Sequence, residues 1–437
     1  MGVKVRLSAG ARMEKFGLKS IRKSASAAVV LLLVGLANAQ APQRISLDQA
    51  IDLALAHSHT LKAARTQIQQ NRAQETTASL RPNPTLSWDA LFLPTFSPQN
   101  FTLDNLANTQ QFDMGVSYLL ERGGKRQHRV EAARDATAVT RYQVDDSERT
   151  LIFNVAQQFI AAQLAQSVLD FALNDLNSFE QTVTISQDRY KAGDISEADL
   201  LKIKLQTLQF QTDVASAQVA KAQALANLRQ LLGYDSVPAD YQIEGELAYL
   251  PLSVNLDDLR SRALKLRPDL LAAQQGVRAA QSQIALAKAN GKVDLATGVS
   301  YSHVADQSSL SAIFSIPLPV FDRNQGEIAR TRFALTQSQE NAQAASDTVL
   351  TDVRNNYEAF SSNQKILQLY LSGYLKQAQD SRDISEYAYK HGAASLLDFL
   401  DAERSYRSTQ LSYRQALANY LISVEQLKAA VGTRTLP

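Results

Sequence analysis

The sequence repeats itself at an offset of about 200 residues, and this duplication limits the possible folds more than any other feature. Residues 190–201, YKAGDISEADLL, correspond to residues 389–400, YKHGAASLLDFL. The starts of the two copies also correspond, at residues 45–48 and 254–257, and so do their ends, at Leu232-Gly233 and Val431-Gly432. A period of this length is far longer than that of a solenoid repeat, so each copy contains several secondary-structure elements.

The first 39 residues have the pattern of a secretory signal peptide. Seven Lys and Arg residues precede an apolar run from Ala27 to Ala37, and the small-residue site Ala37-Asn38-Ala39 follows. This run is too short for a membrane-spanning helix. We therefore expect export, with Gln40 as the first mature residue, while the start codon remains open between Met1 and Met13.

The composition excludes several classes of function. Residues 1–39 hold seven of the 45 basic and one of the 43 acidic residues, which leaves 38 against 42 and a net charge of −4, so nucleic acid is not an expected partner. The chain has no cysteine, which excludes disulfides, thiolate metal sites, a cysteine nucleophile and a lipid-anchored N-terminal cysteine. The five histidines are scattered, so we expect no metal site, no cofactor and no enzyme activity.

Each copy has the same order of elements. An amphipathic helix, expected over 47–80 and 256–290, precedes a β-hairpin, expected over 85–119 and 294–317, in which apolar and polar residues alternate. Long stretches almost free of Gly and Pro then predict helical hairpins over 125–232 and 326–431, with one interruption at Gly373. The expected division is a signal peptide (1–39), a first repeat (40–236), a linker (237–253), a second repeat (254–433) and a tail (434–437).

Four strands of nearly membrane-spanning length predict a mixed α+β membrane protein that is incomplete as a single chain. No apolar run of 18 residues follows residue 39, so strands must supply any membrane-embedded part. Four strands cannot form a closed barrel, and an open sheet edge is not tolerated in lipid. Eight strands from a dimer or twelve from a trimer would close, and a water-filled channel favours the trimer.

The complete pattern over residues 45–433 resembles the TolC-like outer-membrane efflux family. Residues 319–326, PVFDRNQG, and 121–126, ERGGKR, are most similar to its CzcC-type branch, which serves heavy-metal pumps. The resemblance implies a homotrimer in outer-membrane lipid, with a twelve-stranded β-barrel continuing into a periplasmic α-barrel of coiled-coil hairpins. It also implies a periplasmic adaptor protein and an inner-membrane RND pump as partners. The expected function is a passive exit duct for divalent heavy-metal cations or small toxic compounds.

The resemblance also points to a periplasmic gate at the tips of the helical hairpins. In the family, carboxylates form the constriction there, and the matching residues are Asp398 and Asp401, three positions apart and so on one helix face. Their alternative roles are a helix cap for Asp398 and a solvated surface position for Asp401. Asp199 and Tyr389 match further gate contacts, although the arginine of the family is replaced by Ala394.

The tip turns are the expected docking surface for the adaptor. Gly193 and Gly392 suit the left-handed residue after a helix end, and Ser196 and Ser395 have N-cap spacing to an aspartate three residues on. Either Lys390 or Lys202 is a possible replacement for the missing arginine. Two other functions remain open, a duct for type I protein secretion and a periplasmic coiled-coil scaffold without a pore.

Overall fold

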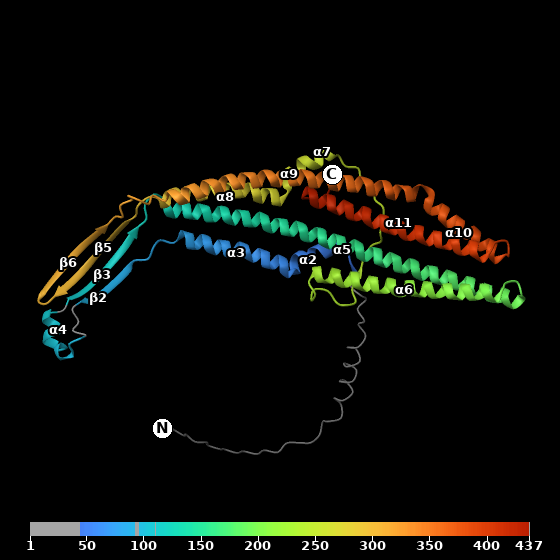
Figure 1. Cartoon of the computed structure of the whole chain (residues 1–437), viewed down its shortest axis with the longest axis horizontal. Helices are drawn as coiled ribbons and strands as arrows, with labels where there is room; N and C mark the ends of the chain where they lie inside the picture. The colour runs from blue at the N-terminus through green and yellow to red at the C-terminus, as the bar shows by residue number, and fades with distance from the viewer. Residues whose placement is uncertain (1–43, 92–95, 110, 437) are drawn as a thin grey trace, which may run out of the picture.

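The protein forms a long rod with a β-sheet at one end and two helical hairpins reaching the other end (Figure 1). The structure is a computed structural model, and it describes residues 44–91, 96–109 and 111–436. The expected signal peptide lies outside these residues. Helix α5 (Lys125–Ala192) alone contains 68 residues and spans about 100 Å at 1.5 Å per residue. The expected mixed α+β fold with long helical hairpins is confirmed.

The two repeats contribute corresponding elements. The first consists of β1 (Arg44–Ile45), α2 (Leu47–His57), α3 (His59–Ser79), β2 (Thr85–Leu91), a 3-10 turn (Pro98–Asn100), α4 (Leu103–Thr109), β3 (Gln111–Leu120), α5 and α6 (Glu197–Leu232). The linker contains β4 (Gln242–Ile243). The second repeat consists of α7 (Leu256–Leu266), α8 (Pro268–Asn290), β5 (Leu295–Val304), β6 (Gln307–Ser315), α9 (Gln325–Leu369), a π-turn (Tyr370–Tyr374), α10 (Leu375–Lys390) and α11 (Leu396–Val431).

The single helices expected over 47–80 and 256–290 are each broken in two, so that prediction was wrong. In the first repeat, Ser58 leaves the helical conformation and its hydroxyl accepts a hydrogen bond from Leu61 N, which caps α3. In the second repeat, Arg267 is extended because Pro268 follows it, and a residue before proline avoids the helical region. The loop expected between the first two strands also contains α4.

The interruption at Gly373 is present as a π-turn between α9 and α10. Gly373 has φ 132°, a backbone conformation that is strained for any residue with a side chain. The equivalent position in the first repeat, Asn174, lies inside the unbroken helix α5. The two long helical arms therefore differ although they derive from one duplicated unit.

The four strands form one antiparallel sheet in the order β2-β3-β5-β6. Its register brings Trp88, Met114, Tyr301 and Leu310 side by side in one row, and all four are exposed in the single chain. The opposite face is polar, with the neighbouring row Ser87, Gly115, Ser300 and Ser311. In these middle rows the sheet thus has one apolar face and one face of small or polar residues.

The core is divided into separate clusters along the rod. Near the middle, α2 packs on α5 and α6 around Phe159 and Leu228, and α7 packs on α9 and α11 around Leu259 and Tyr420. The parallel pair of β1 and β4 joins the start of the first repeat to the linker. These clusters form a collar of packed elements from which the hairpins extend to the tips.

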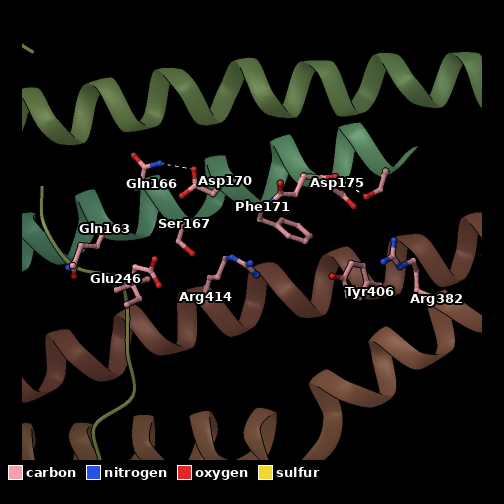
Figure 2. Close-up of a pocket in the computed structure, with 14 residues that line it drawn as sticks. Gln163, Gln166, Ser167, Asp170, Phe171, Asp175, Glu246, Arg382, Tyr406 and Arg414 are labelled. Atoms are coloured by element: carbon pink, nitrogen blue, oxygen red, sulfur yellow. Dashed lines mark hydrogen bonds between the residues drawn. The ribbon is translucent and has the colours of Figure 1, made fainter. Parts of the chain in front are cut away.

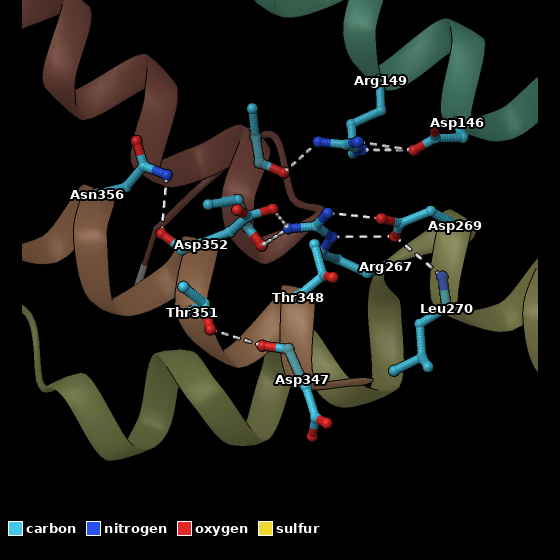
Figure 3. A network of polar contacts seen from close by, with 12 residues as sticks. Asp146, Arg149, Arg267, Asp269, Leu270, Asp347, Thr348, Thr351, Asp352 and Asn356 are labelled. Atoms are coloured by element: carbon cyan, nitrogen blue, oxygen red, sulfur yellow. Dashed lines mark hydrogen bonds and ion pairs between the residues drawn. The ribbon is translucent and has the colours of Figure 1, made fainter. Parts of the chain in front are cut away.

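A buried arginine anchors the collar at the break between α7 and α8 (Figure 3). The guanidinium of Arg267 bonds to Asp269 Oδ2 at 2.5 Å and to Asp352 Oδ2 at 2.9 Å, and Arg267 is 4% exposed. Burial alone would raise the pKa of Asp269, but the hydrogen bonds and charge of Arg267 hold it below its ordinary value. Next to it, Arg149 donates to the carbonyl of Ala429 at 2.9 Å. The network therefore connects three long helices, α5, α9 and α11.

Candidate functional site at the helical tips

Each helical hairpin turns through a glycine in the left-handed conformation. Gly193 has φ 83° and Gly392 has φ 77°, and each follows the end of a long helix. The next helices begin at Ser196 and Ser395, whose hydroxyls accept hydrogen bonds from the backbone N–H of the aspartate three residues on, at 3.1 and 3.2 Å. The repeated motif therefore encodes a tight turn followed by a capped helix start.

Asp398 takes part in a complete capping box. Its Oδ2 accepts from the backbone N of Ser395 at 3.3 Å and from the Ser395 hydroxyl at 2.7 Å. Asp199 accepts the corresponding hydroxyl bond from Ser196 at 2.8 Å. Both aspartates thus take part in capping a helix, the role that the sequence analysis weighed against a gate role for Asp398. Both carboxylates also lie at the tip end of the molecule.

Asp401 lies one turn further along α11 and is exposed. Among the described residues its ion-pair partner is Arg404 of the same helix, at 3.2 Å, and both side chains are more than half exposed. Lys202 pairs with Asp199 in the same helix at 3.5 Å, and Lys390 pairs with Glu386 at 2.7 Å. Neither lysine forms a bond between the two hairpins in the described chain. The tip thus presents carboxylates whose partners lie on their own helices.

Tyr389 is buried between the hairpins, unlike its counterpart Tyr190, which is exposed. Its hydroxyl lies 3.2 Å from Ser186 Oγ on α5, and its ring stacks on Phe399 with centroids 5.5 Å apart. Arg189 of α5 donates to the Tyr389 carbonyl, and its guanidinium lies over the tyrosine ring. Sequence analysis did not identify Arg189, although it stands directly before the repeated motif. It connects the tips of the two hairpins.

A buried charge cluster lies between the hairpins, above the aromatic tip residues. It consists of Asp175 on α5, Arg382 on α10, and Glu403 and Arg407 on α11. Arg407 forms an ion pair with Asp175 Oδ2 at 2.7 Å and a hydrogen bond to Asp213 of α6, and Arg382 lies 4.0 Å from Glu403 Oε2. Asp175 and Glu403 are each 5% exposed. The cluster therefore connects all four helices of the two hairpins through charged groups.

Burial changes the protonation of this cluster. Desolvation first, and then the charge of Asp175, raise the pKa of Glu403 to about 8. Desolvation also raises the pKa of Asp175, against the effect of the Arg407 charge. Both shifts favour the protonated form of this pair of neighbouring carboxylates. Sequence analysis missed this cluster, because single charged residues in a long helix fit a solvated face equally well.

A polar cleft of about 420 Å³ continues from the cluster toward the collar, between α5 and α11 (Figure 2). Gly245 and Glu246 of the linker border one end, and Arg382 borders the other. Arg414 lies over the ring of Phe171 at 4.5 Å, and burial lowers its pKa. The cleft thus exposes charged groups of both repeats beside the hairpin interface.

No described helix is long and apolar enough to cross a membrane. Within the same residues, no three His, Cys, Asp or Glu side chains group together so that they could hold a metal ion.

The whole arrangement can be compared with known proteins. The sequence profile of the family described as outer membrane efflux protein matches residues 50–234 and 259–433, which are the two repeats. The chain belongs to this family. It is 26% identical to the cation efflux system protein CusC of Escherichia coli (strain K12) over 401 residues, covering 86% of this chain and 84% of that one.

The resemblance to the heavy-metal branch is also confirmed. The cobalt-zinc-cadmium resistance protein CzcC of Cupriavidus metallidurans is 21% identical over 371 residues, which cover 84% of this chain and 85% of CzcC. A crystal structure of CusC has a TM-score of 0.73 at 23% identity and covers 89% of this chain and 92% of that one. The fold is therefore that of these channels, and the protein is an outer membrane efflux protein with a long periplasmic portion.

Proposed function

We propose that this protein is the outer-membrane exit duct of a tripartite RND-type system that exports divalent heavy-metal cations. The observation that carries the proposal is the two-faced sheet, whose exposed apolar row can only be stable against lipid or another chain. The relatives named for cation efflux and for cobalt, zinc and cadmium resistance support the substrate class. Transport through such a duct is passive and needs no catalytic residue or cofactor of its own.

The working unit of this proposal is a homotrimer. The single sheet has two free edges, at β2 and β6, which three copies would join into a closed barrel of twelve strands. An apolar stripe on α6, formed by Leu201, Leu205 and Leu208, is exposed in one chain. Exposed apolar residues of α10, Ile384 and Tyr387, provide a matching surface on the other hairpin. Packing α6 of one protomer against α10 of the next would bury both.

The tips would form the gate and the docking surface of this duct. Three copies would bring Asp398 and Asp401 into two carboxylate rings, a fixed negative field that favours cations. Asp199 and Tyr389 would adjoin this gate. The periplasmic adaptor that leads to the pump would contact the tip turns, at Gly193, Ser196, Gly392 and Ser395. The capping bonds of Asp398 hold its carboxylate in place without neutralising it.

Single-channel recording of the purified protein in planar bilayers tests the proposal. The wild type should form small cation-selective pores, and Asp398→Asn with Asp401→Asn should give a larger conductance or a weaker preference for cations at the tip. Asn at position 398 keeps an oxygen that can accept the capping bonds. A matched control is Asp257→Asn with Asp258→Asn, which removes two exposed carboxylates from the first turn of α7 in the collar.

The outcomes distinguish the two parts of the proposal. If the conductance and the cation preference do not change in the tip variant, the protein is still a duct, but Asp398 and Asp401 do not form its gate and Asp398 is a helix cap only. A folded protein that forms no pores, and that fractionates with the soluble periplasm, would contradict the duct itself and favour a scaffold.

A further inference from the structure

The polar face of the sheet carries two aspartates directly beside each other. Asp89 of β2 is the register partner of Asp113 of β3, and the row continues through Ser302 of β5 to Ser309 of β6. Directly opposed residues on neighbouring antiparallel strands have their Cα atoms about 4.5–5.5 Å apart, and like charges in such a pair are destabilising. A sequence selected for stability alone would not place two carboxylates there.

This row lies near the end of the sheet farthest from the helices. Asp113 is the third residue of β3, and Ser302 is followed after two residues by the turn Ala305–Asp306. In Figure 1 this turn and α4 lie at the opposite end of the molecule from the hairpin tips. In the proposed duct, the row is therefore at the outer exit.

The face that carries the row is the one that would line the duct. The residues next to the aspartates along their strands, Trp88 and Met114, point to the other face and are exposed there. Successive side chains of a strand alternate between faces, and the apolar face must contact lipid. The aspartates then face the water-filled interior.

The strands provide no lysine or arginine to neutralise this row, and His303 of β5 lies in the neighbouring row on the other face. Residues 82–121 and 293–322, which include all four strands and their outer connections, contain no Lys and no Arg. They contain seven acidic residues: Asp89, Asp104, Asp113, Glu121, Asp294, Asp306 and Asp322. At the inner end of the sheet, Glu121 and Asp294 pair with Arg129 and Lys125 of α5. The outer carboxylates have no such partner in these segments.

The position of Asp113 is also fixed. Gln111 donates to Asp113 Oδ2 at 2.7 Å and approaches Ser302 Oγ at 3.4 Å, so neutral groups orient the carboxylate without removing its charge. Its other oxygen, Oδ1, is buried and has no hydrogen-bond partner among the described residues. A buried carboxylate oxygen without a donor is costly unless a cation or water reaches it.

We infer that Asp89 and Asp113 form an acidic band that makes the outer exit of the duct selective for cations over anions. The inference rests on the proposed trimer, in which two aspartates per chain give six carboxylates at one level. Within each chain the separation of the two carboxylates is shorter than the Debye length of about 8 Å at physiological salt, so the fields of each pair add. Rings of carboxylates are a common means of cation selection in pores.

The test is the reversal potential of single pores in a KCl gradient, near 0.1 M salt, where screening is weak. The double variant Asp89→Asn with Asp113→Asn should lower the ratio of potassium to chloride permeability by about threefold. The difference should decrease near 1 M salt, where the Debye length is about 3 Å. Mg²⁺ is also added to each side in turn. When it is added from the outer side, Mg²⁺ should reduce the potassium current of the wild type at a lower concentration than it reduces the current of the variant.

A charge-matched control separates the band from the overall charge of the outer end. Asp104→Asn with Asp306→Asn also removes two outer carboxylates, from the first turn of α4 and from the β5–β6 turn. This control should keep the wild-type permeability ratio and the wild-type Mg²⁺ effect. Circular dichroism and trimer mass show whether each variant is folded, and the tip aspartates are unchanged in both.

Three results would decide the matter. Wild-type selectivity in the Asp89 and Asp113 variant overturns the inference while leaving the duct in place. An equal loss in the control variant also overturns it, since the effect would then come from diffuse charge. The absence of pores in every folded protein, wild type included, contradicts the proposed function instead.

Discussion

At the scale of the residue, Arg267 shows how one side chain holds distant elements together. It is buried at a helix break, and it bonds to Asp269, to Asp352 and, at 3.4 Å, to the carbonyl of Ala430. Loss of the guanidinium removes this donor from the Ala430 carbonyl and from the partly exposed carboxylate of Asp352, and it leaves Asp269 with the backbone N–H of Leu270. Breaking buried ion pairs costs several kcal/mol, and the exposure of the two aspartates reduces this value.

We therefore expect Arg267→Ala to destabilise the protein by about 2–3 kcal/mol and to lower the thermal unfolding midpoint in detergent. Arg267→Lys should have an intermediate effect, because lysine keeps the charge but not the two-pronged geometry. Arg330→Ala is the control, since Arg330 also pairs with a carboxylate, Glu327, but on an exposed surface. An Arg267→Ala protein as stable as this control would mean that the network contributes nothing to the collar.

At the scale of the element, the two hairpins are joined by the buried charge cluster rather than by apolar packing alone. Glu403 interacts with Asp175 of α5, Arg382 of α10, and Tyr406 and Arg407 of its own helix. These arginines in turn pair with Asp213 of α6 and with Asp383 and Glu386 of α10. Asp170 of α5 and Arg414 of α11 line the adjoining cleft. Lys390 and Thr182 hold the pKa of Glu386 below its ordinary value despite its burial. Glu403 is the group in this set whose raised pKa is about 8.

The contact between the hairpins should weaken as the pH rises. The pKa of Glu403 is raised in the folded protein, so its stabilising contribution is complete below about pH 4.5 and is lost as the pH increases to about 8. Hydrogen exchange of the α5 and α11 amides near Asp175 should become faster from pH 5 to pH 9, after correction for intrinsic exchange. Glu403→Gln stays neutral and should remove most of this dependence. Glu340→Gln, an exposed glutamate of α9, should keep it.

The sequence predicted the elements better than it predicted their contacts. Alternation identified all four strands, and the scarcity of Gly and Pro identified the long helices. The break at Arg267 could have been seen from Pro268, whereas Ser58 interrupts a pattern that a continuous helix also fits. The tip motifs were visible because they occur twice. The contacts of Glu403 with Asp175 were not, because they depend on how residues more than 200 positions apart pack.

At the scale of the whole molecule, the single chain is incomplete at both ends. The sheet has two unpaired edges, and the helical hairpins expose apolar residues on α6 and α10. Exposed apolar patches of this kind mark surfaces that contact another chain. The proposed trimer accounts for both features with a single symmetry, since each protomer offers one edge and one hairpin to each neighbour.

Charge on the α6 stripe should prevent assembly. Leu205→Glu with Leu208→Glu would place six carboxylates in the proposed interfaces of the three copies, and we expect a monomeric mass by light scattering in detergent, against a trimeric mass for the wild type. The control is Gln211→Glu with Gln218→Glu, at exposed positions of the same helix that flank the leucine stripe on one edge. A trimer in both variants would show that these leucines lie outside the interface.

The two helical arms of each chain differ in structure, so in the proposed trimer they would play different parts. Helix α5 continues for 68 residues without a break, whereas its counterpart is divided at Gly373 into α9 and α10. In a ring of three chains, six arms alternate, and only every second one contains a joint. A change at the periplasmic end would then bend the three jointed arms while the three continuous helices stay in place. The opening would widen through movement of every second arm.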